Sequence, residues 1–432
     1  MSPASGTTRQ SIAIIGTGIA GLGAAHFLND RYDLTLFEQN DYVGGHTNTI
    51  TVDESGCAVP IDTGFMVFNH VTYPNIARLF RELGVQTQPT SMSFSVQHTS
   101  SGLEYNGSSV TQLFGQRRNL VSMRHWRMLL SMDRFNREAV RALDEPRWAN
   151  HTLGQYVAER GYGDDMLNRF LVPMGSAVWS TPPDKMLDFP AMTLLRFWHN
   201  HGFLGMDTQH PWYTVTNGAQ SYVTKITAPF RGRIQTGNRA VRVERRGGIV
   251  RIATQLEGVR EFDKVILSCH ADEALALLTD PTEMERRLLG AFRYQPNTVT
   301  LHTDTSLMPR TRRCWASWNY RIDEARDGGA LASTHYWMNS LQGVSLRKEY
   351  FVSLNSHDRI VPSEVLKRIE YAHPLFDIAA IAAQRDLPQL NRLSADQTTY
   401  YAGAWFKYGF HEDGFTSGLE CARAVDGAAI WT

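Results

Sequence analysis

The sequence predicts an α/β protein in which a Rossmann-like dinucleotide-binding domain carries an inserted α+β substrate domain. Three observations predict this fold: a glycine-rich turn directly after a short apolar strand, an acidic residue at the end of the next strand, and buried-type strands that return late in the chain. The 432 residues are enough for two or three domains with sizeable cores. A hydrophobic content of 42% with 20% charged residues excludes wholesale disorder.

The glycine-rich turn follows an apolar, partly β-branched stretch at residues 12–15 and precedes a helix expected at residues 22–29. It has the pattern G-x-G-x-x-G, and its candidate cofactor-binding residues are Gly16, Gly18, Ile19, Ala20 and Gly21. Gly16 allows the tight turn, Gly18 lets the backbone approach a pyrophosphate, and Gly21 lets the helix pack closely on the strand. The strand and helix on either side make this a specific dinucleotide-binding signal.

The second strand, residues 34–37, ends in Glu38. This carboxylate comes 22 residues after Gly16, where it can accept hydrogen bonds from both ribose hydroxyls of an adenosine. An acid at this position would repel a 2′-phosphate, so NADP is disfavoured.

A second glycine pair follows the acidic strand end, at Gly44 and Gly45, with His46 next in the chain. The backbone N–H groups of such a pair can form another anion cradle, although an ordinary glycine turn is the alternative. A further short strand then ends at glycine, where a flat ring could approach the backbone closely. The candidate residues at that point are Thr63, Gly64 and Phe65.

These motifs resemble the flavin-containing amine oxidase superfamily, which includes protoporphyrinogen oxidases, phytoene-desaturase-like enzymes and polyamine oxidases. Further segments resemble a bacterial subgroup described only as predicted NAD/FAD-binding, amine oxidase-like proteins: "GGHTNTI", "DTGFMVFN", "MGSAVWSTPP", "LDFPAMTLLRFWHNHG", "WASWNY" and "GFHEDGFTSGLECA". The resemblance extends from Ile12 to about Ala424. It implies a GR2-type FAD-binding domain and FAD as the cofactor. Some relatives of the subgroup act on unsaturated or branched fatty acyl chains, including steps toward furan fatty acids.

The resemblance also implies a discontinuous FAD-binding domain at residues 10–90, 215–290 and 395–432, with the substrate domain at 91–214 and 291–394. Period-two alternation at 239–244, a buried-type strand at 264–268 and another at 399–403 fit this division. Val241 falls where the backbone of relatives contacts adenine. A helix expected from about Thr416 to Ala424 would direct its free N–H groups at the flavin. Candidate contacts there are Gly403, Ala404, Gly414, Phe415 and Thr416.

Two absences indicate how electrons enter. The chain has no second G-x-G-x-x-G for NAD(P)H, and its four cysteines are far apart without a C-x-x-C pair. The simplest mechanism is therefore that a substrate C–H bond gives a hydride to flavin N5, and oxygen or another acceptor reoxidises the flavin. No cysteine lies near residue 385, where relatives with covalent flavin carry one, so FAD is expected to bind non-covalently.

Departures from the amine oxidase pattern disfavour an amine substrate. The resemblance places a flavin-side lysine of those enzymes at the strand of residues 297–300, but no lysine occurs between Lys264 and Lys348. It also places a tyrosine of the amine cage at Phe415, and an acid near the ribityl chain at Ala404.

Candidate catalytic residues are His411, Lys407 and Tyr408. An ordinary histidine pKa near 6.5 would let His411 act as a base or orienting donor, and a histidine hydrogen-bonded within a turn is an equal alternative. No metal site is expected, because His199, His201 and His210 occur without carboxylate or cysteine ligands in a binding pattern. The tryptophans and four methionines indicate core packing, with an acyl-chain tunnel as the alternative: Met174, Met186, Met192 and Met206.

Together these features predict an FAD-dependent oxidoreductase that desaturates or oxidises an apolar substrate, a fatty acyl chain such as one in furan fatty acid formation. The alternatives are a flavin-dependent double-bond isomerase without net redox, a flavoprotein that binds lipid or a partner without catalysis, and an amine oxidase. Equal numbers of basic and acidic residues, 43 each, argue against a nucleic-acid partner. Scattered cysteines and the lack of a long apolar run favour the cytoplasm, with peripheral contact at the inner membrane left open.

The basic residues are almost all arginine, since only six of the 43 are lysine. Codon bias explains such a ratio. The alternative is that some arginines bind lipid head groups or a carboxylate through the planar guanidinium. Candidates for this role are Arg117, Arg118, Arg310, Arg312 and Arg313.

Overall fold

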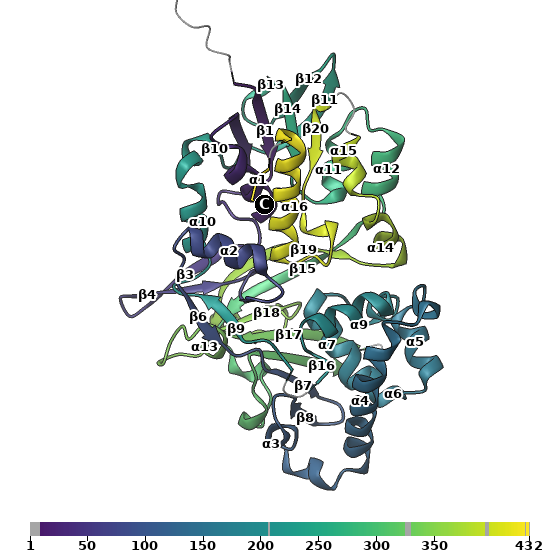
Figure 1. Ribbon diagram of the computed structural model, residues 1–432. Helices are drawn as coiled ribbons and strands as arrows, with labels where there is room; N and C mark the ends of the chain where they lie inside the picture. The colour runs from purple at the N-terminus through teal and green to yellow at the C-terminus, as the bar shows by residue number, and fades with distance from the viewer. Residues whose placement is uncertain (1–8, 206–207, 325–329, 394–396, 428, 432) are drawn as a thin grey trace, which may run out of the picture.

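The computed structural model describes residues 9–205, 208–324, 330–393, 397–427 and 429–431. Figure 1 shows two regions, a parallel sheet with its helices at one end and a larger mixed sheet with a group of helices at the other. No helix in the described ranges is both long and apolar enough to cross a membrane. Met206, one of the four methionines considered for core or tunnel, lies outside the described residues.

A five-stranded sheet with all strands parallel forms the first region, in the order β10-β2-β1-β14-β20. Its strands are β1 (Ser11–Ile15), β2 (Asp33–Phe37), β10 (Ile234–Gln235), β14 (Lys264–Leu267) and β20 (Thr399–Tyr401). Parallel strands are buried on both faces, which explains the continuous apolar run of β1. This sheet confirms the predicted α/β class, and its strands come from all three predicted segments of the cofactor domain, whose boundaries stay a prediction.

Alternate residues of β1 pack into two separate hydrophobic cores, one on each face of the sheet. Ile12 and Ile14 pack with α1 (Ile19–Leu28) and α16 (His411–Asp426) on one face of the sheet. Ala13 and Ile15 face the other core, which is covered by an antiparallel sheet and α11. The elements on that side are β11 (Ala240–Arg246), β12 (Ile249–Thr254), β13 (Gly258–Phe262), α11 (Ala271–Leu277), α12 (Glu283–Leu289), α14 (Ile378–Gln384) and α15 (Pro388–Arg392).

The second region is built on a seven-stranded sheet in the order β19-β15-β18-β17-β16-β7-β8. Its strands are β7 (Phe94–His98), β8 (Leu103–Asn106), β15 (Arg293–His302), β16 (Trp318–Glu324), β17 (Ala330–Trp337), β18 (Phe351–Leu354) and β19 (Val365–Leu375). The long antiparallel pair β15–β19 extends from this sheet up to the parallel sheet, as Figure 1 shows. It therefore carries side chains of the second region to the edge of the first.

Smaller elements complete the two regions. The remaining strands are β3 (Thr49–Glu54), β4 (Cys57–Asp62), β5 (Phe68–Asn69), β6 (Thr87–Thr90) and β9 (Trp212–Val215). The remaining helices are α2 (Pro74–Glu82), α3 (Val110–Leu113), α4 (Met123–Ala142), α5 (Leu153–Arg160), α6 (Asp164–Met166), α7 (Val172–Trp179), α8 (Pro183–Met186), α9 (Ala191–Asn200), α10 (Gln220–Thr227) and α13 (Met338–Leu341).

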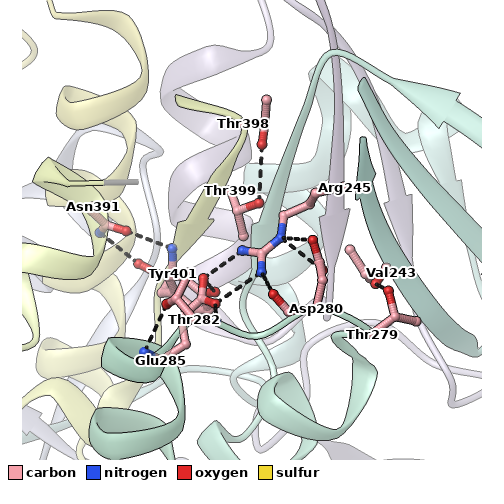
Figure 2. A network of polar contacts seen from close by, with 10 residues as sticks. All are labelled: Val243, Arg245, Thr279, Asp280, Thr282, Glu285, Asn391, Thr398, Thr399 and Tyr401. Atoms are coloured by element: carbon pink, nitrogen blue, oxygen red, sulfur yellow. Dashed lines mark hydrogen bonds and ion pairs between the residues drawn. The ribbon is translucent and has the colours of Figure 1, made fainter. Parts of the chain in front are cut away.

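A buried ion pair connects three elements of the first region. Figure 2 shows the guanidinium of Arg245 on β11 facing the carboxylate of Glu285 on α12, with N–O distances of 2.6 and 3.0 Å. Tyr401 on β20 donates to the same carboxylate at 2.6 Å, and Arg245 also contacts Asp280. The two paired side chains are only 8% and 7% exposed. Burial raises the pKa of Glu285, but the hydrogen bonds from Arg245 and Tyr401 outweigh it, so the net shift is downward.

We expect Glu285→Ala to lower the free energy of unfolding by about 3–5 kcal/mol, because it leaves a buried guanidinium without its partner. Arg251→Ala is the matched control, since its ion pair with Glu261 is 46% and 54% exposed and should contribute about 1 kcal/mol or less. Urea unfolding measures the free energy of unfolding of both variants. Because the folded-state pKa of Glu285 is lowered, the difference between wild type and variant should narrow as the pH falls through that pKa. Equal losses in the two variants would contradict the assigned role.

Candidate cofactor and substrate site

A cavity of about 690 Å³ lies at the carboxyl ends of the parallel strands. The strand ends that line it are Ile15 and Gly16 after β1, Phe37 and Glu38 after β2, Ser268 after β14, and Gly403 after β20. Ligands of open α/β sheets bind at this edge. The second region supplies the opposite wall through β19 and part of the aromatic surface described below.

Glycine contacts shape the narrow part of the cavity. Gly18 and Gly44 pair as an isolated parallel bridge, which brings the two glycine motifs together. A Cβ on Gly21 would lie 2.1 Å from the carbonyl oxygen of Gly16, so only glycine fits there. A Cβ on Gly18 would meet nothing within 4 Å, which leaves open space beside that backbone. This arrangement offers a groove for a ligand between the two motifs.

The beginning of α1 opens into the same groove. Its first residue after Gly18 is Ile19, no side chain caps the helix, and no acidic residue lies in its first turn. The first N–H groups of α1 therefore have no side-chain acceptor, and the helix dipole favours a negative charge in front of them. A pyrophosphate has the charge and the acceptor oxygens that such an end binds.

Glu38 holds the glycine turn to β2. One carboxylate oxygen accepts from the backbone N–H and the hydroxyl of Thr17, at 3.0 and 2.6 Å. The other oxygen accepts from the backbone N–H and side-chain amide of Asn40, both at 2.9 Å. Sequence reasoning missed Thr17 and Asn40, because neither belongs to a spacing motif. The predicted contact between Glu38 and an adenosine ribose stays a prediction.

Most of the predicted cofactor residues line the cavity: Gly16, Gly18, Ile19, Ala20, Glu38, Gly44, Gly45, His46, Gly64, Phe65, Val241, Gly403, Ala404 and Gly414. Four do not. Gly21 packs behind the turn, and Thr63 bonds to the carbonyl of Asn48 and the hydroxyl of Tyr371. Thr416 bonds to Asn75 on α2. Phe415 is fully buried in a core cluster.

The position of Phe415 corrects an expectation about the last helix. The sequence predicted a helix from about Thr416, but α16 begins at His411, where the Asp413 side chain accepts the Phe410 N–H at 3.0 Å. This earlier start turns Phe415 toward Phe27 and Trp431, with ring centroids 5.8 and 5.6 Å away. Phe410, rather than Phe415, lines the cavity.

The three predicted catalytic residues differ in position. The His411 ring stacks on Phe65 with centroids 3.8 Å apart, and its Nε2 lies 2.5 Å from the Tyr222 hydroxyl. Burial lowers the pKa of His411 to about 3, so the ring is neutral near pH 7 and a weak base. Tyr408 lines the cavity, whereas the exposed Lys407 does not. The hydrogen-bonded, packed role for His411 therefore fits the geometry better than the role of a base.

A broad aromatic and methionine wall forms the rest of the cavity. It comprises Met66, Met92, Trp179, Phe197, Phe203, Trp212, Trp318, Tyr336, Phe376, Trp405, Tyr408 and Phe410. Of the residues considered for core packing or an acyl-chain tunnel, four tryptophans face the cavity: Trp179, Trp212, Trp318 and Trp405. Met174 and Met186 belong instead to the core cluster. Such a surface excludes water and favours an apolar ligand.

Two asparagines fix the orientation of a cavity histidine that the sequence did not single out. The Thr298 N–H donates to Asn355 Oδ1, and Asn355 Nδ2 donates to Asn297 Oδ1 at 2.7 Å. Asn297 Nδ2 donates to the Gln295 carbonyl and lies 2.9 Å from His373 Nδ1. Since Nδ2 is the donor, His373 Nδ1 is the acceptor and Nε2 carries the proton. Burial lowers the pKa of His373 to about 4, so the cavity gains a neutral N–H donor.

His46 leaves a buried polar atom for a ligand to satisfy. Its ring stacks on Tyr371 at 4.7 Å, and its Nε2 has no hydrogen-bond partner among the described residues. Burial lowers the pKa of His46 well below its usual range, with His373 and His270 adding to the shift. A buried unpaired nitrogen costs free energy unless a bound group completes it. Together with the open groove at Gly18, this indicates that a polar, extended cofactor fits the site.

Comparison with known sequences identifies the cofactor. A sequence model described as flavin containing amine oxidoreductase matches residues 19–426. FAD is therefore the cofactor of this chain, and the glycine groove, the α1 N-terminus and His46 have free polar atoms that would suit it. No protein of curated function matches the chain by sequence.

Solved structures share the fold over nearly the whole chain. Putrescine oxidase, bound to putrescine, has 13% identity and a TM-score of 0.65, and the match covers 97% of this chain and 99% of that one. Cyclohexylamine oxidase from Brevibacterium oxydans IH-35A has 16% identity and a TM-score of 0.65, with 96% and 98% covered. A fatty acid isomerase from P. acnes that produces CLA has 17% identity, a TM-score of 0.65 and the same coverage. These likenesses show the fold.

We expect Glu38→Arg to lower the FAD content of the purified protein by about tenfold or more, because it removes the four hydrogen bonds that position the glycine turn. Glu283→Arg, an exposed site on α12, makes the same charge change far from the cavity and should leave FAD content unchanged. Flavin absorbance per protein measures both, and circular dichroism checks folding. Full flavin content in a folded Glu38→Arg protein would contradict this role.

We expect ¹⁵N NMR of histidine-labelled protein to show His373 as a neutral ring with its proton on Nε2 at pH 6 and above. The signal of His373 is identified as the one that disappears from the spectrum of the His373→Gln variant. Asn297→Asp replaces the donor to Nδ1 by an acceptor, so it should move the proton to Nδ1 and raise the pKa of His373. A wild-type His373 with its proton on Nδ1 would refute the asparagine arrangement.

Proposed function

The chain belongs to the flavin-containing amine oxidoreductase family and is an FAD-dependent oxidoreductase, and on this premise we propose that it oxidises a fatty acyl chain. The proposed reaction is desaturation or a related C–H oxidation, as in the formation of furan fatty acids. The observation that carries this proposal is the aromatic and methionine wall of the cavity. A long apolar chain can bury its surface against such a wall.

The polar residues of the cavity do not favour an amine. A cationic substrate that binds by an ion pair needs a carboxylate, and three carboxylates line the cavity among the described residues. Glu38 is bound to the glycine turn, Glu273 accepts from the His270 N–H, and Glu370 accepts from the Thr298 hydroxyl. Each therefore has a hydrogen-bonding role within the protein. No lysine lines the cavity among the described residues.

The solved neighbours show that one fold serves both substrate classes. Putrescine and cyclohexylamine oxidases are named for amines, and the P. acnes protein is a fatty acid isomerase. The choice between acyl chain and amine in this protein therefore depends on the side chains of the cavity, and not on the fold.

The residues of this chain divide the work of the proposed reaction. The glycine groove and the α1 N-terminus would bind the pyrophosphate of the cofactor. Bound FAD supplies a hydride acceptor for the C–H bond. The aromatic wall excludes water and orients the chain. The neutral His373 holds a proton on Nε2, where it can donate a hydrogen bond without adding a charge to an apolar site.

We further place the enzyme in the cytoplasm, peripheral to the inner membrane, with oxygen or another small molecule as the electron acceptor. An acyl substrate is consistent with this placement, since acyl chains reside in membranes. Non-covalent FAD is part of the same proposal.

Anaerobic mixing of the FAD-loaded enzyme with candidate acyl lipids tests the reaction. We expect lasting loss of flavin absorbance and a product with one additional double bond by mass spectrometry, because hydride transfer without an acceptor leaves the flavin reduced. A product of unchanged mass with oxidised flavin would instead establish double-bond isomerisation. Reduction of the flavin by polyamines, and not by acyl lipids, would establish an amine oxidase and refute the acyl proposal.

A further inference from the structure

A cluster of apolar side chains is exposed where η1 (Arg117–Val121) meets α4. We call it the apolar tip, and its members with their exposed fractions are Leu120 (45%), Val121 (86%), Met123 (73%), Trp126 (44%) and Leu130 (65%). Figure 1 shows α3 and the beginning of α4 at the end of the molecule away from the parallel sheet. Among the described residues Phe114 packs against Trp126, with ring centroids 5.0 Å apart, and the rest of the apolar tip stays largely exposed.

The exposed side chains of the apolar tip are not the ones that pack α4 against the rest of the protein. The inner face of α4 is already buried through His125, Met128, Phe135 and Ala139. Further along α4 the outer face is polar, as at Asp133, where an ion pair forms with Arg137. The exposed apolar groups gather at the beginning of α4, and only Val140, at 42% exposed, lies further along the helix. An apolar patch of this kind on an amphipathic helix marks an interaction surface.

The segment that forms the apolar tip carries only positive charge. Residues 105–132 contain four arginines and no aspartate or glutamate. Arg124 is paired with Asp165, while Arg117, Arg118 and Arg127 make no ion pair within the described ranges. By contrast, Arg312, one of the arginines singled out in the sequence, lies over Trp315 and pairs with Glu349. Arg312 is therefore committed to an ion pair within the protein, whereas Arg117 and Arg127 are not, and Arg118 donates only to the neutral carbonyl of Gly102.

We propose that the apolar tip and its arginines form the surface by which the protein docks on an anionic lipid membrane. Val121 and Met123 would enter the boundary between head groups and acyl chains, and Trp126 has the amphipathic ring that favours this depth. Arg117, Arg118 and Arg127 would pair with lipid phosphates. The inference deepens the proposed function, because a membrane-docked enzyme can take its acyl chain from the bilayer, but the surface itself is tested without turnover.

The test measures binding of the full-length, FAD-loaded protein to vesicles by co-sedimentation. We expect binding to vesicles that contain phosphatidylglycerol, weaker binding to pure phosphatidylcholine, and loss of binding with added salt. Arg117→Gln with Arg118→Gln should weaken binding about fivefold per arginine. Val121→Glu with Met123→Glu should weaken it by tenfold or more, since it removes the inserted apolar groups.

A matched control uses another exposed apolar pair. Leu256 and Val259 are 68% and 56% exposed on the sheet of β11–β13, and Leu256→Glu with Val259→Glu should leave vesicle binding unchanged. Flavin content and circular dichroism confirm that each variant is folded. These checks separate a loss of membrane contact from a loss of structure.

Three outcomes would overturn the proposal: no vesicle binding by wild type, equal weakening by the control pair, or a concentration-dependent dimer that the tip variants abolish while vesicle binding persists. The last would assign the surface to a second copy of the chain. Vesicle binding that depends on the tip, together with no acyl turnover, would support the surface and refute the proposed substrate. Turnover of a dispersed acyl substrate without vesicle binding would support the proposed substrate and refute the membrane-docking surface.

Discussion

Close approach of backbones at glycine positions is the constraint on which the rest of the structure depends. Gly21 packs against the Gly16 carbonyl, and a Cβ on Gly418 of α16 would lie 2.3 Å from the carbonyl oxygen of Ala20 on α1. These contacts join the first and last helices directly, without side chains between them. The C-terminal helix α16 thereby becomes part of the region built on the parallel sheet. The same contacts place the beginning of α16 at the cavity. Any larger residue at these positions would separate the helices and open the cofactor groove.

The cavity combines two regions of different chemistry. The parallel sheet contributes backbone N–H groups and glycines, which suit phosphates and do not discriminate among substrates. The second region contributes aromatic rings and the His373 donor through β19, which extends to the edge of the first sheet. The parallel-sheet region therefore supplies the backbone groups suited to phosphate. Side chains of both regions supply the apolar wall, since Trp405 and Phe410 lie between β20 and α16.

Neutral histidines are a consistent property of this cavity. Burial lowers the pKa of His46, His373 and His411, and each ring is held by stacking or by a hydrogen bond. Charged imidazoles would be costly in an apolar site, whereas neutral rings offer donors and acceptors without that cost. These histidines thus offer hydrogen-bonding atoms beside the aromatic wall without adding charge to it.

The sequence by itself determined the cofactor-binding half of the protein. The G-x-G-x-x-G turn, Glu38 and the Gly44–Gly45 pair are local signals, because phosphate binding requires particular backbone shapes within a few residues of chain. The tertiary structure alone decided which side chains face the cavity. Phe410 and not Phe415 lines the cavity because α16 begins at His411, and the proton position of His373 depends on Asn297 of β15 and on Asn355, which follows β18. Such features depend on where a helix begins and on pairing between distant strands, and neither leaves a pattern in the local sequence.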